Sequence, residues 1–286
     1  MSETTGTLYL CATPIGNLED ITFRVLNVLK QVDVIGAEDT RHTLKLLNHF
    51  EIHTPMISYH EHNKADRGPE LVERLRSGQD VAIVSDAGMP GISDPGSDLV
   101  QLALEAGIKV TPLPGANAAL AGLVCSGLDT RMFTFIGFLP KTTKKRRELI
   151  STLATNPYTL IFYESPHRLK ATLAELAAGL GDRQAAAGRE LTKKFEEFVR
   201  GSLTKLQEHF AMHQPRGEFT LIIAGTGEEK APVPSDEEDQ SSPLEAVLNL
   251  VAQGTNKKDA IRMVALKRGI SKREVYQAVV EHEKTI

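Results

Sequence analysis

Short apolar runs alternate with amphipathic stretches along the first 130 residues of the chain. Such runs are typical of strands buried on both faces, and the stretches between them space their apolar residues like helices packed on a sheet. The alternation predicts a mostly parallel α/β sheet, with Gly78 and Gly107 ending two of its helices. The predicted strands are Leu8–Ala12, Val32–Ala37, Met56–Tyr59, Val81–Val84 and Lys109–Pro112.

The same alternation predicts a second α/β domain over residues 131–227. An acidic, polar stretch at 228–242 has little capacity for burial and predicts a linker. Residues 243–286 predict a small basic domain of helices, of which the last two resemble a helix-turn-helix. The strands expected in the second domain are Phe133–Phe138, Thr159–Tyr163, Ala185–Gly188, Phe195–Val199 and Phe219–Ala224.

Composition argues against a membrane or secreted protein. No stretch approaches the roughly 18 consecutive apolar residues of a membrane span, and the N-terminus lacks the basic and apolar regions of a secretion signal. Cys11 and Cys125 are the two cysteines, both in apolar surroundings and far apart in sequence. They are expected to be inert buried thiols, so a reducing, cytoplasmic location with no membrane partner is predicted.

Charge is unevenly distributed, although the formal net charge is only −4. Basic residues dominate the C-terminal helices, which can therefore engage phosphates. The run Lys141–Arg147 holds five cations and no acid, so it is either a solvated helix face or a phosphate-binding patch. The expected phosphate contacts are Lys144, Lys145, Arg146, Arg147, Lys257, Lys258, Lys272 and Arg273.

Three loops rich in small residues follow predicted strands, at Thr13–Asn17, Ser85–Gly96 and Pro112–Ala119. Their convergence beyond the carboxyl ends of a sheet implies a ligand held largely by backbone groups. They lack the glycine patterns of dinucleotide and P-loop sites, and they contain no lysine for a polyphosphate. S-adenosylmethionine, with its cationic sulfonium, fits better. The alternative is that these are tight turns in which Asp86 and Asp94 only cap helices.

Longer motifs carry a resemblance to a family. The chain from Leu8 to Ala224 resembles the tetrapyrrole-methylase superfamily of methyltransferases. Within it, SDAGMPGISDPG, AEDTRHT and YESPHRL resemble the bacterial branch that methylates the 2′-hydroxyl of a cytidine in small-subunit ribosomal RNA. The resemblance implies two α/β domains with S-adenosylmethionine between them and a homodimer. It also implies ribosomal RNA as the partner, in an assembled or nearly assembled 30S subunit.

The resemblance carries the cofactor site onto matching positions. The first loop, Pro14-Ile15-Gly16-Asn17, lacks the family's acidic residue, so only Pro14 is transferred from it. The second domain is expected to line the adenosine pocket with Phe162, Tyr163 and Thr220. The remaining cofactor contacts are expected at Ser85, Asp86, Ala87, Gly88, Ile92, Pro114, Gly115, Ala116, Asn117 and Ala118.

Methylation of a ribose hydroxyl is helped by a group that accepts its proton. Asp39 and Glu164 are the first candidates, with Glu38 as a third, because each follows a predicted strand. Asp39 could instead cap a helix, and Glu164 could instead pair with Arg168. The cations expected to place RNA phosphates near them are Arg41, His167 and Arg168.

The cluster His60-Glu61-His62 lacks a clear third ligand, so no metal site is expected. Two other functions compete with RNA methylation: the same fold acting on a tetrapyrrole or other small molecule, and a DNA-binding regulator that senses a ligand. The basic run and the basic tail count against the first, and three cofactor-type loops count against the second.

Overall fold

The computed structural model describes residues 5–227, 242–252, 255–268 and 270–283. They fall into two compact units, Met1–Glu228 and Glu229–Ile286, each of which is described by itself. Most of the linker expected at 228–242 lies outside the described residues. No helix in the described ranges is both long and apolar enough to cross a membrane.

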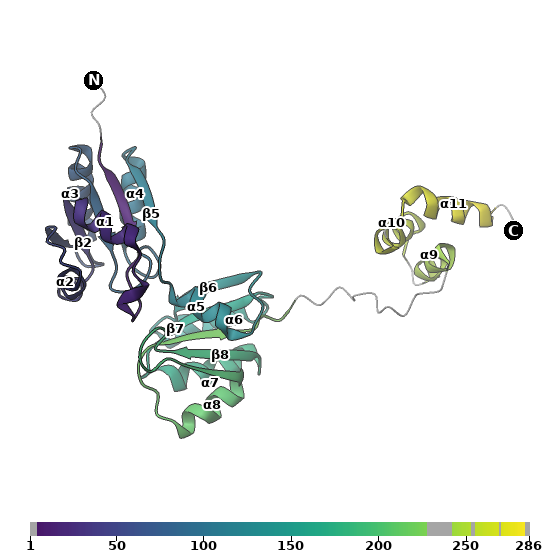
Figure 1. Ribbon diagram of the computed structural model, residues 1–286. Helices are drawn as coiled ribbons and strands as arrows, with labels where there is room; N and C mark the ends of the chain where they lie inside the picture. The colour runs from purple at the N-terminus through teal and green to yellow at the C-terminus, as the bar shows by residue number, and fades with distance from the viewer. Residues whose placement is uncertain (1–4, 228–241, 253–254, 269, 284–286) are drawn as a thin grey trace. The chain divides into compact units, whose positions relative to one another are not determined.

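The first sheet of the larger unit is entirely parallel, with the strand order β3-β2-β4-β1-β5. Its strands are β1 (Thr7–Cys11), β2 (Val34–Ala37), β3 (Met56–Ser58), β4 (Val81–Val84) and β5 (Lys109–Leu113). Helices α1 (Phe23–Gln31), α2 (Thr40–His49), α3 (Lys64–Arg76) and α4 (Gly96–Glu105) connect them. Figure 1 labels β2 and β5 of this sheet and the four helices α1 to α4 of the same part of the chain. Gly78 and Gly107 follow α3 and α4 with positive φ, which confirms that these glycines end the two helices.

Both faces of this sheet are covered, which explains the uninterrupted apolar runs. In β4, Val81 and Ile83 pack into the cluster that contains Leu71 and Leu99 of α3 and α4. The alternate residues Ala82 and Val84 pack into a second cluster, with residues of α1 and α2.

The second sheet is mixed, in the order β6-β7-β10-β8-β9, with β6 parallel to β7 and the other pairs antiparallel. The strands are β6 (Phe133–Phe138), β7 (Thr159–Glu164), β8 (Gln184–Arg189), β9 (Glu197–Ser202) and β10 (Phe219–Ile223). The helices are α5 (Ala118–Ser126), α6 (Thr143–Leu153), α7 (Leu169–Leu180) and α8 (Leu203–Met212). Alternate residues of β7 serve its two faces: Leu160 and Phe162 pack with α6, α7 and α8, and Ile161 packs with α5.

The C-terminal unit contains α9 (Pro243–Ala252), α10 (Lys257–Arg268) and α11 (Lys272–Glu283) around its own apolar cluster. The S-x-x-E pattern starts α9 and α11. At α11, Ser271 accepts a hydrogen bond from the Glu274 backbone N–H at 3.2 Å, and the Glu274 carboxylate accepts one from the Ser271 N–H at 2.9 Å. These reciprocal bonds satisfy donors that the first turn leaves free, so the local sequence fixes where the helix begins.

One cysteine prediction is wrong. Cys11 is buried, and burial raises the pKa of its thiol to about 12, as an inert thiol requires. Cys125 is exposed instead, because α5 buries only one face against the sheet and Cys125 lies away from it.

Candidate functional site

Sheet topology brings the three glycine- and proline-rich loops together. They follow β1, β4 and β5, which are neighbours in the first sheet with their carboxyl ends at one edge. The backbones of Thr13 and Gly88 exchange hydrogen bonds of 2.9 and 3.1 Å. The Thr13 hydroxyl also donates to the Ser85 carbonyl at 3.2 Å. The first two loops are therefore joined directly.

The loop after β4 is shaped by Asp94. Its carboxylate accepts hydrogen bonds from the backbone N–H groups of Gly91 and Gly96, both at 2.8 Å. Gly88, Gly91 and Ser93 have φ values of 82°, 89° and 68°, so the loop passes three times through the left-handed region. Such a conformation in a serine is uncommon and is maintained by its surroundings, which marks this loop as a candidate binding element.

The loop after β5 approaches β1 closely and links the two sheets. A Cβ at Gly115 would lie 2.8 Å from the Ala12 Cβ, so no larger residue fits without movement. Asn117 caps α5 by accepting a hydrogen bond from the Leu120 N–H at 3.0 Å. The Ala119 N–H donates to the Tyr163 hydroxyl at 3.2 Å, which joins the start of α5 to the second sheet.

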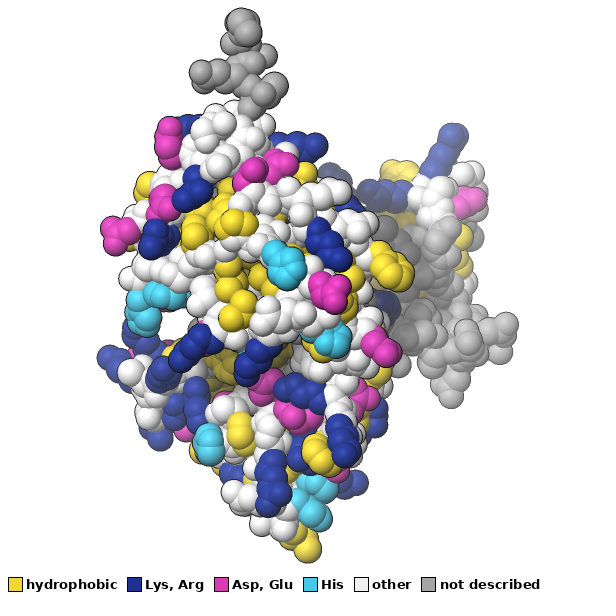
Figure 2. Space-filling model, turned by 60° about the vertical axis from the view of Figure 1, so that its left-hand side comes forward, with side chains coloured by type: hydrophobic (Ala, Val, Ile, Leu, Met, Phe, Trp, Pro, Cys, Tyr) yellow, Lys and Arg dark blue, Asp and Glu magenta, His cyan; other side chains and the backbone are white. Residues whose placement is uncertain are grey.

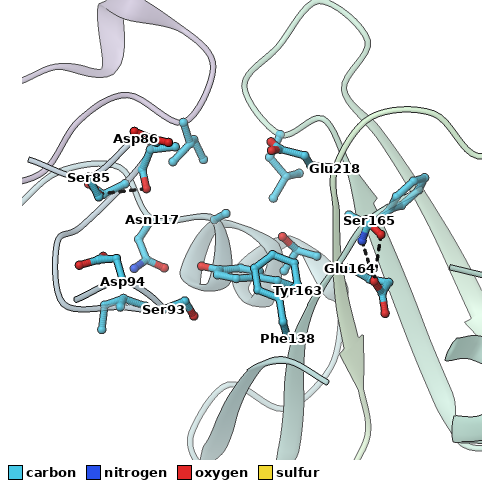
Figure 3. Close-up of a pocket in the computed structure, with 18 of the residues that line it drawn as sticks. Ser85, Asp86, Ser93, Asp94, Asn117, Phe138, Tyr163, Glu164, Ser165 and Glu218 are labelled. Carbon is cyan, nitrogen blue, oxygen red and sulfur yellow. Dashed lines mark hydrogen bonds between the residues drawn. The ribbon is translucent and has the colours of Figure 1, made fainter. Parts of the chain in front are cut away.

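These loops face the second sheet across a cavity of ≈ 460 Å³. Figure 3 shows Ser85, Asp86, Asp94 and Asn117 on one side and Phe138, Tyr163, Glu164 and Glu218 on the other. The volume lies within the range of about 300–1,000 Å³ that is usual for small-molecule sites. Burial raises the pKa of the Tyr163 hydroxyl, so this ring presents a neutral aromatic face.

The cavity is strongly acidic. Among its described lining residues Lys193 is the one cation, and its ammonium is bound by Glu190 at 3.0 Å and Glu218 at 2.8 Å. The other lining carboxylates are Glu38, Asp86, Asp94 and Glu164. Burial, followed by the charges of Asp86 and Asp94, raises the pKa of the Glu38 carboxyl, and a hydrogen bond from the Asp86 backbone opposes the rise.

Many of the residues expected to bind the cofactor do line this cavity: Ser85, Asp86, Ala87, Gly88, Ile92, Asn117, Ala118, Tyr163 and Thr220. Others are not among its lining residues: Pro14, Pro114, Gly115, Ala116 and Phe162. Pro14 and Phe162 are buried, so they support the loop and the sheet beneath the cavity.

Sequence reasoning missed the segment after β8. Glu190, Leu191 and Lys193 line the cavity, and Glu190 and Thr192 have positive φ values of 47° and 67°. The Thr192 hydroxyl accepts a hydrogen bond from the Asn17 N–H at 3.1 Å, which ties this segment to the loop after β1. Its position directly after a strand was the signal that could have found it.

Both leading candidates for proton acceptance are engaged in other contacts. Asp39 caps α2 and is paired with Arg41 at 2.9 Å, and hydrogen bonds from Arg41 lower the pKa of its carboxyl to about 2. It is not among the lining residues. Glu164 is 2% exposed, and it accepts hydrogen bonds from the Thr172 hydroxyl at 2.6 Å and the Ser165 N–H at 2.7 Å. Arg168 lies 3.9 Å away, so the capping and pairing alternatives describe these residues.

Of the residues expected to contact phosphates, some are engaged in contacts within the protein and others are exposed. Arg146 is largely buried by an ion pair with Glu175, and Arg168 donates to the Leu139 carbonyl at 3.1 Å. Lys144, Lys145, Arg147 and His167 are exposed. On the face drawn in Figure 2, Lys and Arg side chains are most numerous over its lower half.

A basic groove lies between α10 and α11 of the C-terminal unit. Among its described lining residues the one acid is Asp259, whose carboxylate accepts a hydrogen bond from Asn256 at 2.6 Å. Tyr276 is 57% exposed and adds an aromatic surface. The basic lining residues are Lys257, Lys258, Arg262, Lys272 and Arg273, four of which were expected from sequence. No cluster of three or more metal-ligating side chains occurs in the described ranges.

Comparison with known proteins decides the family. A family model described as tetrapyrrole (corrin/porphyrin) methylases matches residues 7–207. The chain belongs to this family. The family resemblance inferred from sequence is therefore confirmed.

Curated relatives match nearly the whole chain. A protein of Halalkalibacterium halodurans is 52% identical over 274 residues, which cover 95% of this chain and 93% of the relative. A protein of Bacillus subtilis is 48% identical over 277 residues, covering 96% and 94%. Both relatives are named ribosomal RNA small subunit methyltransferase I.

Solved structures confirm the fold class. Diphthine synthase has a TM-score of 0.58 at 14% identity, covering 77% of this chain and 90% of that one. A uroporphyrin-III C-methyltransferase from Thermus thermophilus, complexed with S-adenosylhomocysteine, has a TM-score of 0.54 at 21% identity, covering 78% and 98%. At these identities the likeness shows the fold alone.

Family membership confirms the expected cofactor, S-adenosylmethionine. The cavity fits it chemically, because a sulfonium cation favours a site rich in carboxylates and aromatic faces. The chain is thus a methyltransferase of this family that uses S-adenosylmethionine.

Proposed function

We propose that this protein methylates the ribose 2′-hydroxyl of a cytidine in small-subunit ribosomal RNA. The observation that carries the proposal is the identity of 44–52% to relatives named small-subunit ribosomal RNA methyltransferases over nearly the full chain. The acidic cavity suits a cationic cofactor, and the separate basic groove suits an anionic substrate such as RNA.

S-adenosylmethionine, when bound, supplies a methyl carbon activated by the positive sulfur. We assign several tasks to the chain's own residues. The loop Ser85–Gly88 and the start of α5 at Asn117 offer backbone and side-chain polar groups to the amino-acid part of the cofactor. Tyr163 and Thr220 line the opposite wall and are assigned to the adenosine. Pro14, Pro114, Gly115, Ala116 and Phe162 hold the shape of these walls.

The remaining tasks concern the charge of the cavity and the binding of RNA. Carboxylates of the cavity stabilise positive charge, whereas their repulsion of phosphates leaves RNA binding to other surfaces. We assign phosphate contacts to the exposed cations Lys144, Lys145 and Arg147 and to the basic groove.

We also propose four parts of the chain, at 1–130, 131–227, 228–242 and 243–286, and a homodimer. Support for a dimer comes from α5, where Leu120 and Val124 are 48% and 68% exposed. They lie four residues apart and hence on one helix face, which a partner copy could cover. A ribosomal substrate places the protein in the cytoplasm.

The decisive experiment offers radiolabelled S-adenosylmethionine with 30S subunits, and separately with deproteinised RNA, from a strain that lacks this protein. Label is expected in a 2′-O-methylcytidine after nuclease digestion, and more label in subunits than in naked RNA. Label on a base would contradict the ribose assignment. Transfer to a tetrapyrrole with none to RNA would favour the small-molecule alternative, and specific DNA binding without transfer would favour the regulator.

A further inference from the structure

Glu38 occupies a position that distinguishes it from every other carboxylate of the cavity. It follows β2 directly and is half-buried among the lining residues. The neighbouring Asp39 faces elsewhere, because it caps α2 and pairs with Arg41. Two adjacent residues at the end of one strand therefore have different surroundings, and only Glu38 lines the cavity.

The other lining carboxylates are committed to structure. Asp86 accepts a hydrogen bond from the Asp39 N–H at 3.0 Å, and Asp94 shapes its own loop. Glu190 and Glu218 bind Lys193, and Glu164 binds Thr172 and Ser165. In the described part of the chain, no Lys, Arg or His forms an ion pair with Glu38. The carboxylate of Glu38 therefore keeps acceptor capacity for a further hydrogen bond.

The electrostatic surroundings of Glu38 suit proton acceptance. Burial is the largest cause that raises the pKa of this carboxyl, and the charges of Asp86 and Asp94 add to it. A carboxylate whose pKa lies above its ordinary value is a stronger base toward a hydroxyl proton. The Asp86 backbone opposes part of this rise in pKa.

We propose that Glu38 is the group that accepts the 2′-hydroxyl proton during methyl transfer. The proposal rests on the proposed function. The ribose oxygen forms a bond to the methyl carbon as the carbon–sulfur bond breaks, and that electron pair remains on sulfur. The hydroxyl O–H bond breaks with its proton passing to Glu38, which later releases it to water. Atoms and charge are thereby balanced without another reactant.

The test compares full-length wild type with Glu38→Gln and Glu38→Asp. At saturating 30S subunits, Glu38→Gln is expected to lower the single-turnover methylation rate about 10²–10⁴-fold, the usual contribution of a general base. Glu38→Asp keeps a carboxylate and should recover part of that loss. S-adenosylhomocysteine affinity and subunit affinity should stay within about twofold of wild type, because a base acts on the rate rather than on binding. An equal loss of cofactor affinity in Glu38→Gln would instead assign Glu38 to binding.

Stability gives a readout that does not depend on activity. A carboxyl whose pKa is raised in the folded state holds its proton to higher pH than in the unfolded chain. The wild type should therefore lose stability relative to Glu38→Gln as pH rises above about 4.5, the ordinary pKa of the group. Melting temperatures across this pH range measure the difference and also show that the variant folds.

The outcomes distinguish a failure of the Glu38 proposal from a failure of the proposed function. If wild type transfers no methyl group to ribosomal RNA, the proposed function fails. If wild type is active and Glu38→Gln keeps a near-normal single-turnover rate, the function stands and the role of Glu38 is overturned. The role of Glu38 is also overturned if the stability difference between wild type and Glu38→Gln does not change with pH.

Discussion

The acidic cavity of the larger unit and the basic groove of the C-terminal unit make an informative pair. In the cavity, one lysine is neutralised by two glutamates and further carboxylates surround it. In the groove, the lining residues that the structure describes are five Lys and Arg side chains, a single aspartate, Ile261 and Tyr276. The cavity is built mainly from loops at strand ends, whereas the groove is built from two helices. One chain thus carries two surfaces suited to ligands of opposite charge.

This difference accounts for how a protein with a net charge of −4 can act on a polyanion. Screening limits surface electrostatics to about 10 Å at 0.1 M salt, so the local charge at a contact matters more than the total. A cationic cofactor gains from the acidic cavity, and phosphates gain from the groove. If this division holds, changes in one region should leave the ligand of the other unaffected.

Reversing the charge of the groove should have the largest effect. The change Lys258→Glu, Arg262→Glu, Lys272→Glu and Arg273→Glu is expected to lower RNA affinity by roughly 10²-fold or more at low salt. It should also flatten the dependence of log affinity on log salt, by about 0.7 for each phosphate of single-stranded RNA that the variant leaves unneutralised. Filter binding across a salt series measures both, and S-adenosylhomocysteine affinity should not change.

A matched variant controls for net charge. Lys30, Lys45, Lys109 and Lys170 are exposed residues of the larger unit outside the groove. Their joint reversal to Glu should reduce RNA affinity far less than the groove variant. Equal losses in the two variants would show that total charge, and not the groove, governs RNA binding.

Filling the space at Gly115 should produce the next largest effect, on the other ligand. Gly115→Val forces movement, because even a Cβ would lie 2.8 Å from Ala12. Overpacking costs about 1–3 kcal/mol, so cofactor affinity is expected to fall about 10–100-fold by calorimetry. RNA affinity should persist. Gly107→Asn is the control, since nothing lies within 4 Å of a Cβ there and Asn tolerates positive φ.

Removing the aromatic surface of the groove should cost less. Tyr276 is 57% exposed beside the basic side chains, where a base can stack on it. Stacking is worth about 1–3 kcal/mol per base, so Tyr276→Ala is expected to weaken single-stranded RNA binding about tenfold. Tyr276→Phe keeps the ring and should bind normally. Identical RNA affinities of Tyr276→Ala and wild type would show that the groove contacts only phosphates.

The sequence predicted much of the fold because its elements are encoded locally. The runs Val81–Val84 and Phe133–Phe138 appear as strands with the expected bounds, and the capping pattern Ser271–Glu274 begins α11. Strand order was not accessible in this way. Whether β1 lies between β4 and β5, or β10 between β7 and β8, is set by long-range packing that short sequence patterns do not encode.

Parts of the cavity could be predicted from sequence where the backbone conformation requires a particular residue type. Glycines marked the loop at Gly88, and a strand end marked the region of Glu38 and Asp39. Which of these two carboxylates lines the cavity depends on the turn into α2, where Asp39 caps the helix and pairs with Arg41. The ion pair of Arg146 with Glu175 could not be predicted from local sequence, because Glu175 lies on another helix.

The smallest expected effect concerns Asp39, and it separates a capping role from a catalytic one. Asn caps helices about as well as Asp, so Asp39→Asn should leave methylation within about twofold of wild type, whereas Asp39→Ala should lower the melting temperature.

Hydrogen bonds from Arg41 lower the pKa of the Asp39 carboxyl from 3.8 to about 2. A carboxyl whose pKa is lower in the folded than in the unfolded state stabilises the folded protein at pH values above the unfolded pKa. That stabilisation is lost as pH falls through the folded pKa. The advantage of wild type over Asp39→Asn should therefore be present at neutral pH and disappear between about pH 4 and pH 2. Melting curves across this window measure it, and a large loss of single-turnover rate in Asp39→Asn at unchanged stability would return Asp39 to the reaction in place of Glu38.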